Sequence, residues 1–83
     1  MFAKVITPDE NVFEGEIIQA KFPGTSGEFE VLENHAPLIS TLETGKLMLK
    51  TPNNERQEFQ IEGGVVEILH NQVTVLVESL IRS

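Results

Sequence analysis

The stretch QEFQIE at residues 57–62 decides the fold class, because apolar and polar positions alternate along it. The first, third and fifth residues, including Phe59 and Ile61, fall on one side of an extended strand. The second, fourth and sixth, which are Glu or Gln, fall on the other side. A period of two predicts a β-strand with one buried face.

Strand patterns continue on both sides of this stretch. Phe2–Thr7 alternates loosely, and Val12–Phe22 is a long extended segment in which Gly15 would tolerate a bulge. VTVLV at residues 73–77 is β-branched at four positions and is expected to need cover on both faces, as in an inner strand of a sandwich. Gly, Asn and Pro turn signals recur at intervals of about 8 to 12 residues, which is typical of short-stranded sandwiches and barrels. We therefore predict an all-β domain with minimal helix.

The size of the chain limits it to one domain. Eighty-three residues are too few for two separate cores, and no repeat or linker divides them, so residues 1–83 are expected to fold together. The composition, 40% hydrophobic and 23% charged, is close to that of ordinary globular domains. The absence of cysteine removes disulfides and thiolate metal sites, so packing alone must stabilise the core.

Charge and hydropathy restrict the partners. Thirteen acidic residues against six basic ones give a net charge of -7, which would repel phosphate backbones, so no nucleic acid is expected. Apolar runs such as 75–77 are far shorter than the roughly 20 residues that cross a bilayer. The alternating start of the chain lacks the basic and apolar regions of a secretory signal. These features predict a soluble cytoplasmic protein that does not insert into the membrane.

Residues capable of catalysis or metal binding are few. His35 and His70 lie outside any nucleophile motif, and with no cysteine they match no common metal-ligand spacing. Ser26 lacks the upstream glycine of a nucleophile elbow. Thr44-Gly45-Lys46 lacks the earlier glycine and the following hydroxyl of a phosphate loop. We predict no catalytic, metal or cofactor site, and therefore no enzyme.

One segment stands out, GTSGEFEVLENHAPL at residues 24–38. It is either a connecting loop with a short strand at 28–32 or a surface presented to a partner. Ala36 must stay extended because a proline follows it, which stiffens the end of the segment. His35 is able to bond either a carbonyl or a partner, depending on its tautomer. The residues alone leave both interpretations open.

Two ordered blocks resemble the epsilon subunit of F-type ATP synthases. GEFEVLENHAPL (27–38) and TGKL (44–47) are similar to the family pattern GExGIxxxHAPL followed by PGxL. EGGVVEI (62–68) and NQVTVL (71–76) are similar to GGxxEV followed by NxVTVL. Residues 6–15 also resemble the first hairpin of the family, so the resemblance covers nearly the whole chain.

The resemblance implies a ten-stranded β-sandwich of two mostly antiparallel sheets. It also implies a non-catalytic rotor subunit of the central stalk, which couples the gamma subunit to the polar loops of the c-ring during proton- or sodium-driven ATP synthesis, below the alpha/beta catalytic head. Its place would be peripheral, on the cytoplasmic face of a bacterial inner membrane. Carboxylates facing c-ring arginines would fix the register of the contact. Carried over residue by residue, the resemblance places His35 at the gamma interface and the following residues at the c-ring interface: Gly27, Glu28, Phe29, Glu30 and Val31.

The sequence departs from the family in two places. Glu30 replaces the glycine after G-E-x, and Glu33-Asn34 replaces the P-G before histidine, which makes the segment more acidic. Many members continue beyond the position of residues 79–82 into two helices that inhibit ATP hydrolysis and in some members bind ATP. This sequence stops at Ser83, so neither activity is expected from it.

A lipoyl- or biotin-type carrier domain is the alternative from a different functional class. Such domains are also small acidic β structures, and they present one lysine at the tip of a tight hairpin. Lys50 is the candidate lysine, but Leu49 and Thr51 flank it in place of the small residues or methionines expected there.

Overall fold

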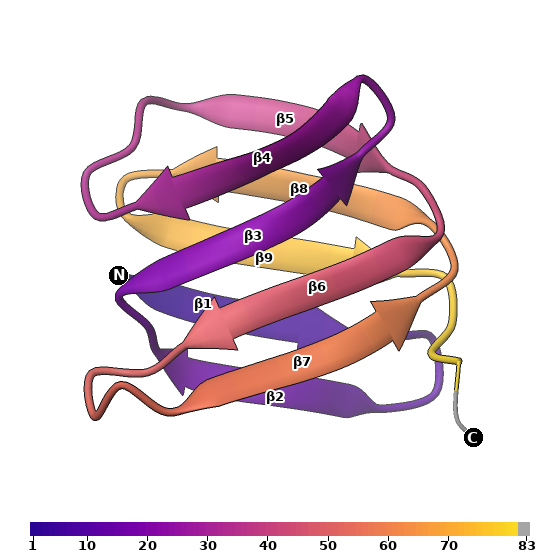
Figure 1. The fold of residues 1–83 in the computed structure, drawn as a ribbon, viewed down its shortest axis with the longest axis horizontal. Helices are drawn as coiled ribbons and strands as arrows, with labels where there is room; N and C mark the ends of the chain where they lie inside the picture. Colours follow the sequence, from indigo (N-terminus) through magenta and orange to yellow (C-terminus); the bar gives the residue numbers. More distant parts are fainter. Residues whose placement is uncertain (82–83) are drawn as a thin grey trace.

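The alternating residues form nine β-strands and no helix within residues 1–81, the part of the chain that the computed structural model describes (Figure 1). The all-β prediction is confirmed. Residues 82–83 of the predicted 1–83 domain lie outside the described part. The strands are β1 (Phe2–Ile6), β2 (Asn11–Glu16), β3 (Gln19–Gly24), β4 (Gly27–Leu32), β5 (Leu38–Leu42), β6 (Gly45–Lys50), β7 (Arg56–Ile61), β8 (Gly64–Leu69) and β9 (Gln72–Val77).

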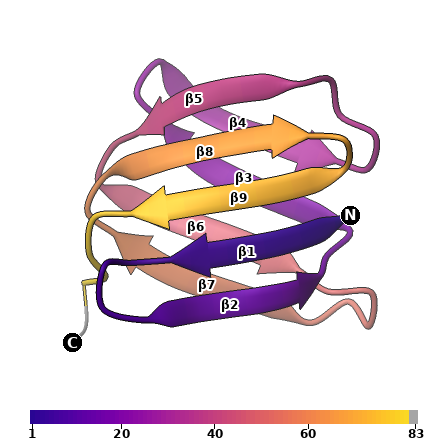
Figure 2. The ribbon, with the colours of Figure 1, turned by 180° about the vertical axis from the view of Figure 1, so that it is seen from behind.

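The strands lie in two layers. They form one continuous nine-stranded sheet that folds into two layers, which we call the first sheet (order β2-β1-β9-β8-β5) and the second sheet (order β4-β3-β6-β7). Within residues 1–81, the strand pairing that connects the two sheets is that of Gly24 of β3 with Leu42 of β5. All neighbours are antiparallel except β1 and β9, which run parallel. The second sheet is nearest the reader in Figure 1, and the first sheet is nearest the reader in Figure 2, which shows the molecule from behind. This arrangement confirms a sandwich of two mostly antiparallel sheets.

The strand count is nine, one fewer than expected. Residues 79–81 run beside the end of β7, where the Ile81 amide donates to the Gln60 carbonyl over 2.8 Å. Only one bridge forms there, between Ile61 and Leu80, which is too little for a strand. The chain therefore places its last described residues along an existing strand and adds no tenth one.

Apolar side chains fill the space between the sheets. Within residues 1–81, no polar or charged residue is buried. Each large aliphatic side chain that is removed from water contributes roughly 1.5–3 kcal/mol, so this core supplies most of the favourable free energy of folding. The largest fully buried side chains are Phe22, Ile17, Leu47, Leu49, Ile61, Ile68, Val5, Val31, Val66, Val73 and Val75.

The prediction that residues 73–77 are covered on both faces is wrong for the isolated chain. Val73, Val75 and Val77 point into the core, but Leu76 points outward and is 51% exposed. The strand is central within its sheet, between β1 and β8, yet nothing within residues 1–81 lies over its outer face (Figure 2). Although β9 is an inner strand of its sheet, residues 1–81 thus cover only one of its faces.

His70 lies in a tight turn between two strands. Leu69 pairs with Gln72, so His70 and Asn71 form a two-residue hairpin loop between β8 and β9. Both have positive φ, 50° and 62°, as a type I′ turn requires, and asparagine adopts this conformation readily. His70 therefore has a structural position at the tip of a hairpin.

Candidate functional site

The predicted c-ring residues lie on β4, an edge strand of the second sheet. Glu28 and Glu30 project to its outer face, where Glu28 is opposite Pro23 and Glu30 is opposite Lys21 of β3. The side chain of Glu30 accepts a hydrogen bond from Gln19, also on β3. Two exposed carboxylates thus lie on the outer face of the strand.

Val31 differs from the glutamates of the predicted c-ring set in the direction of its side chain. Alternation along β4 points this side chain inward, and it is fully buried in the core. Phe29 is half-buried, and its ring centroid lies 5.4 Å from that of Phe22. Within the predicted set, only the exposed Gly27, Glu28 and Glu30 present themselves freely to a partner.

The tip of the β3–β4 hairpin is fixed to the first sheet. The Thr25 amide donates to the Thr41 carbonyl over 3.1 Å, and the two threonine hydroxyls lie 2.7 Å apart. Gly27 follows with φ 126°, a conformation that residues with a Cβ rarely adopt. The hairpin is therefore held in a defined position relative to both sheets.

His35 lies in the loop that carries the chain from β4 to β5. Its Nδ1 is 2.7 Å from the Ala36 carbonyl oxygen. A carbonyl only accepts, so Nδ1 carries a proton and donates this hydrogen bond. The Asn34 amide donates to Asn71 Oδ1 over 2.8 Å, which ties the loop to the β8–β9 turn. His35 thus has a structural hydrogen bond and one ring nitrogen left for a partner.

The structure does not bring the two predicted interfaces together. Gly27 begins β4 and His35 follows its end, so a strand of six residues, roughly 16 Å between its first and last Cα atoms, separates them. A partner at each end is compatible with this separation.

The sequence-based reasoning missed an apolar patch on the outer face of the first sheet. Large side chains of three neighbouring strands are exposed there, with Ile39 of β5 71% exposed and Leu76 of β9 51% exposed. Val65 and Leu69 of β8 are also exposed, and the exposed Glu67, which is directly opposite Ile39, lies between them on the same strand face. We call Ile39, Val65, Leu69 and Leu76 the apolar face. Monomeric proteins rarely leave such clusters uncovered unless a partner binds them.

The strand register aligns two of these side chains, Val65 and Leu76, in one row across the sheet. Leu76 is directly opposite Val65 on one side and Ile6 of β1 on the other. Val65 is in turn opposite Thr41 of β5. A row across four strands is therefore apolar or carries only a hydroxyl, and it presents a nearly continuous contact surface.

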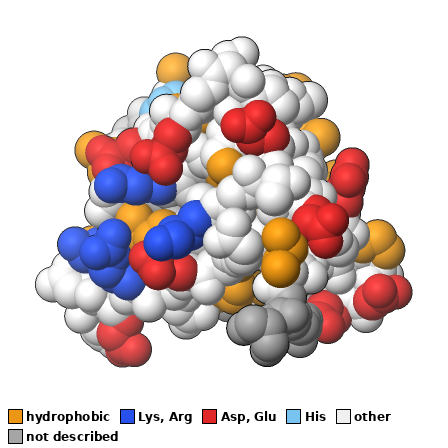
Figure 3. All heavy atoms as spheres, turned by 45° about the vertical axis from the view of Figure 1, so that its right-hand side comes forward, with side chains coloured by type: hydrophobic (Ala, Val, Ile, Leu, Met, Phe, Trp, Pro, Cys, Tyr) orange, Lys and Arg blue, Asp and Glu red, His pale blue; other side chains and the backbone are white. Residues whose placement is uncertain are grey.

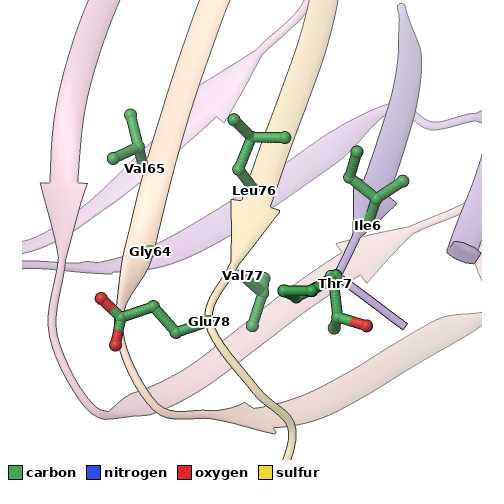
Figure 4. Close-up of a pocket in the computed structure, with 8 residues that line it drawn as sticks. Ile6, Thr7, Gly64, Val65, Leu76, Val77 and Glu78 are labelled. Carbon is green, nitrogen blue, oxygen red and sulfur yellow. The ribbon is translucent and has the colours of Figure 1, made fainter. Parts of the chain in front are cut away.

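A groove of about 430 Å³ deepens one end of the apolar face (Figure 4). Gly64 forms part of it and allows β8 to approach β9 closely, because a Cβ at this position would lie 2.4 Å from the Leu76 carbonyl oxygen. Glu78 lies at one end of the groove and is its charged residue. The lining consists of Ile6, Thr7, Pro8, Gly64, Val65, Leu76, Val77 and Glu78.

No group of three or more His, Asp or Glu residues between positions 1 and 81 is placed to hold a metal ion. Over the same residues, no helix has the length and hydropathy needed to span a bilayer.

Comparison with known families gives one clear match. The model of the family described as "ATP synthase, Delta/Epsilon chain, beta-sandwich domain" matches residues 1–83. The ATP synthase epsilon chain of Salinibacter ruber is 39% identical over 84 residues, which cover 92% of this chain and 56% of the relative. That of Chlorobium limicola is 36% identical over 76 residues, 92% of this chain and 86% of the relative. The chain thus spans little more than half of the first relative.

Solved structures show the same fold. A chain in the cryo-EM structure of the Euglena gracilis mitochondrial ATP synthase, OSCP/F1/c-ring, superposes with a TM-score of 0.88 and 18% identity, over 95% of this chain and 51% of that one. A chain of the Tetrahymena thermophila mitochondrial ATP synthase central stalk/c-ring gives 0.82 and 16%, over 98% and 65%.

Proposed function

The chain belongs to the family of the ATP synthase delta/epsilon chain β-sandwich domain, and from this membership we propose that it is a non-catalytic rotor subunit of an F-type ATP synthase. In this role it would couple the gamma subunit to the polar loops of the c-ring while ion flow drives ATP synthesis at the alpha/beta head. It would act on the cytoplasmic face of a bacterial inner membrane, as a peripheral component. The observation that carries the proposal is the apolar face.

The apolar face is suited to a lasting contact. Its four side chains are exposed on one side of a single sheet. Covering what they still expose would contribute roughly 3–6 kcal/mol, taking about 1.5–3 kcal/mol for each fully buried side chain. A stable interface buries at least about 1,000 Å², and the row across β1, β9, β8 and β5 offers the apolar centre of such an area.

We assign gamma to the apolar face and the c-ring to the β3–β4 hairpin. The His35 loop borders the apolar face, since Pro37, Ile39 and Leu69 line a common groove. Gamma bound to the face would therefore meet the loop as well. At the hairpin, Glu28 and Glu30 would pair with c-ring arginines through charge-assisted hydrogen bonds.

Mechanical stiffness is the property such a subunit requires. The core is entirely apolar within residues 1–81, and close-packed interiors have low compressibility. The hairpin tip is bonded to the opposite sheet through Thr25 and Thr41, so a force on the hairpin passes into both layers. The domain would thus transmit torque from the ring to gamma with little deformation.

The carrier-domain alternative finds no support in the placement of its lysine. Lys50 lies within β6, paired with Arg56 on one side and Gln19 on the other, and is half-buried. The following turn has its tip at residues 52–54, away from Lys50. A lysine inside a sheet is not presented to a modifying enzyme.

Co-elution with gamma tests the proposal. The purified chain and gamma are mixed at micromolar concentration and run on a sizing column. Leu76→Glu places a charge in the apolar face and should weaken binding at least tenfold. Leu32→Glu is the matched control, because Leu32 is 53% exposed but lies on the second sheet. Failure of the unmodified chain to bind, or equal loss in both variants, would overturn the proposal.

A further inference from the structure

The second sheet carries a concentration of basic residues on its outer face. The chain has a net charge of -7 and only six Lys and Arg residues, yet four of the six lie on this face. Alternation with the buried side chains of the same strands sets their direction. Figure 3 shows Lys and Arg side chains gathered together with acidic neighbours on one side of the molecule. The four are Lys21 of β3, Lys46 and Lys50 of β6, and Arg56 of β7.

Three of these cations lack acidic partners. Lys46 lies 3.7 Å from Glu58, but Lys21, Lys50 and Arg56 form no ion pair with any residue between positions 1 and 81. Lys21 is directly opposite Glu30, which instead accepts a hydrogen bond from Gln19. The two carboxylates nearest in the register, Glu30 and Glu58, therefore interact with Gln19 and Lys46 instead.

Lys50 and Arg56 are directly opposite each other in the β6–β7 pair. Like charges in this arrangement destabilise a sheet. Met48 of β6 lies in the neighbouring row, between Lys21 of β3 and Glu58 of β7. Its side chain is only 3% exposed, although it is not part of the core cluster. Neighbouring side chains of the same face therefore lie over it, which keeps their stems close to the sheet and their charged groups at the surface.

We infer that Lys21, Lys50 and Arg56, the basic patch, bind an acidic segment of a protein partner. The three residues lie on adjacent strands, so they span roughly 10 Å, a distance that two or three carboxylates of a short segment match. A long polyanion or an anionic membrane would also meet the acidic remainder of the chain and be repelled. A short segment meets the patch and at most the acidic residues of the same face, Glu28, Glu30 and Glu58, so it avoids most of the negative charge of the chain. Because the patch and the apolar face belong to opposite sheets, both can be occupied at once.

A fluorescein-labelled hexaglutamate peptide is the probe, with fluorescence anisotropy measured at low salt. The full 83-residue chain should bind the peptide with a sub-millimolar Kd. The affinity should fall as salt is added, because salt screens interactions between exposed charges. The double variant Lys50→Gln with Arg56→Gln should bind about tenfold more weakly. Lys4→Gln is the matched control, because Lys4 lies on the outer face of the first sheet.

A second measurement separates binding from a structural role. Lys50→Gln removes the like-charge pair, so its Tm should equal or exceed that of the unmodified chain while peptide binding falls. A lower Tm would indicate that Lys50 only supports the fold. Absence of binding at about 1 mM peptide, equal weakening by Lys4→Gln, or binding to phosphatidylserine vesicles without peptide binding would each overturn the inference. None of these outcomes depends on the co-elution with gamma.

Discussion

Gly64→Ala should destabilise the domain strongly. Gly64 has φ 154°, and a Cβ there would lie 2.4 Å from the Leu76 carbonyl oxygen and 3.1 Å from the Val77 Cα. Both contacts are with backbone, so no side-chain rotation relieves them and β8 must move away from β9. Strained backbone alone costs about 1–3 kcal/mol per residue. With the displacement of the hairpin added, we expect a loss of about 2–4 kcal/mol in the free energy of unfolding.

Gly15→Ala is the matched control, since a Cβ at Gly15 would meet only the Phe13 ring, at 3.7 Å. This variant should be neutral or stabilised by up to about 1 kcal/mol, because alanine has less freedom in the unfolded chain. Urea unfolding followed by circular dichroism measures both, as the chain has no Trp or Tyr to report by fluorescence. If Gly64→Ala lies within about 0.5 kcal/mol of Gly15→Ala, the close approach of β8 and β9 described above is incorrect.

Three further outcomes are expected. Phe22→Ala removes the largest fully buried side chain and should lower the free energy of unfolding by about 3–5 kcal/mol in urea; a loss below about 1 kcal/mol would contradict its place in the core. Asn71→Gly keeps the turn but removes the acceptor of the Asn34 amide, so this amide should exchange faster with deuterium while core amides are unchanged. If the hairpin assignment is right, Glu28→Gln should weaken binding to isolated c-rings several-fold at low salt and equal the unmodified chain at high salt; a difference independent of salt would contradict it.

The fold class could be predicted because it depends on a local signal. Alternation in residues 57–62 is readable without any partner strand, and the apolar residues it selects, such as Ile61, are buried. The same alternation also places Glu28 and Glu30 outside and Val31 inside. The resemblance places Val31 in the c-ring set together with these glutamates, although its strand pattern points it inward.

The apolar face and the basic patch were harder to predict, for different physical reasons. Alternation marks Leu76 as outward-facing but does not say whether the same chain or a partner covers it. The patch depends on register: the turn after β6 has the length that places Arg56 opposite Lys50, and five residues separate the two in the sequence. Which residues face each other across strands depends on tertiary structure. Composition alone therefore predicted the net negative charge but not the clustering of the basic residues.

The parallel pairing of β1 with β9 has a consequence for synthesis of the protein. Phe2 is aligned with Gln72, so residues that pair between these two neighbouring strands of the first sheet lie 70 positions apart in the sequence. During synthesis on a ribosome, β1 would emerge early, and one of its edges would stay unpaired until β9 left the exit tunnel. Such distant contacts slow folding. Nascent chains stalled before residue 72 should therefore remain susceptible to proteases and should recruit chaperones.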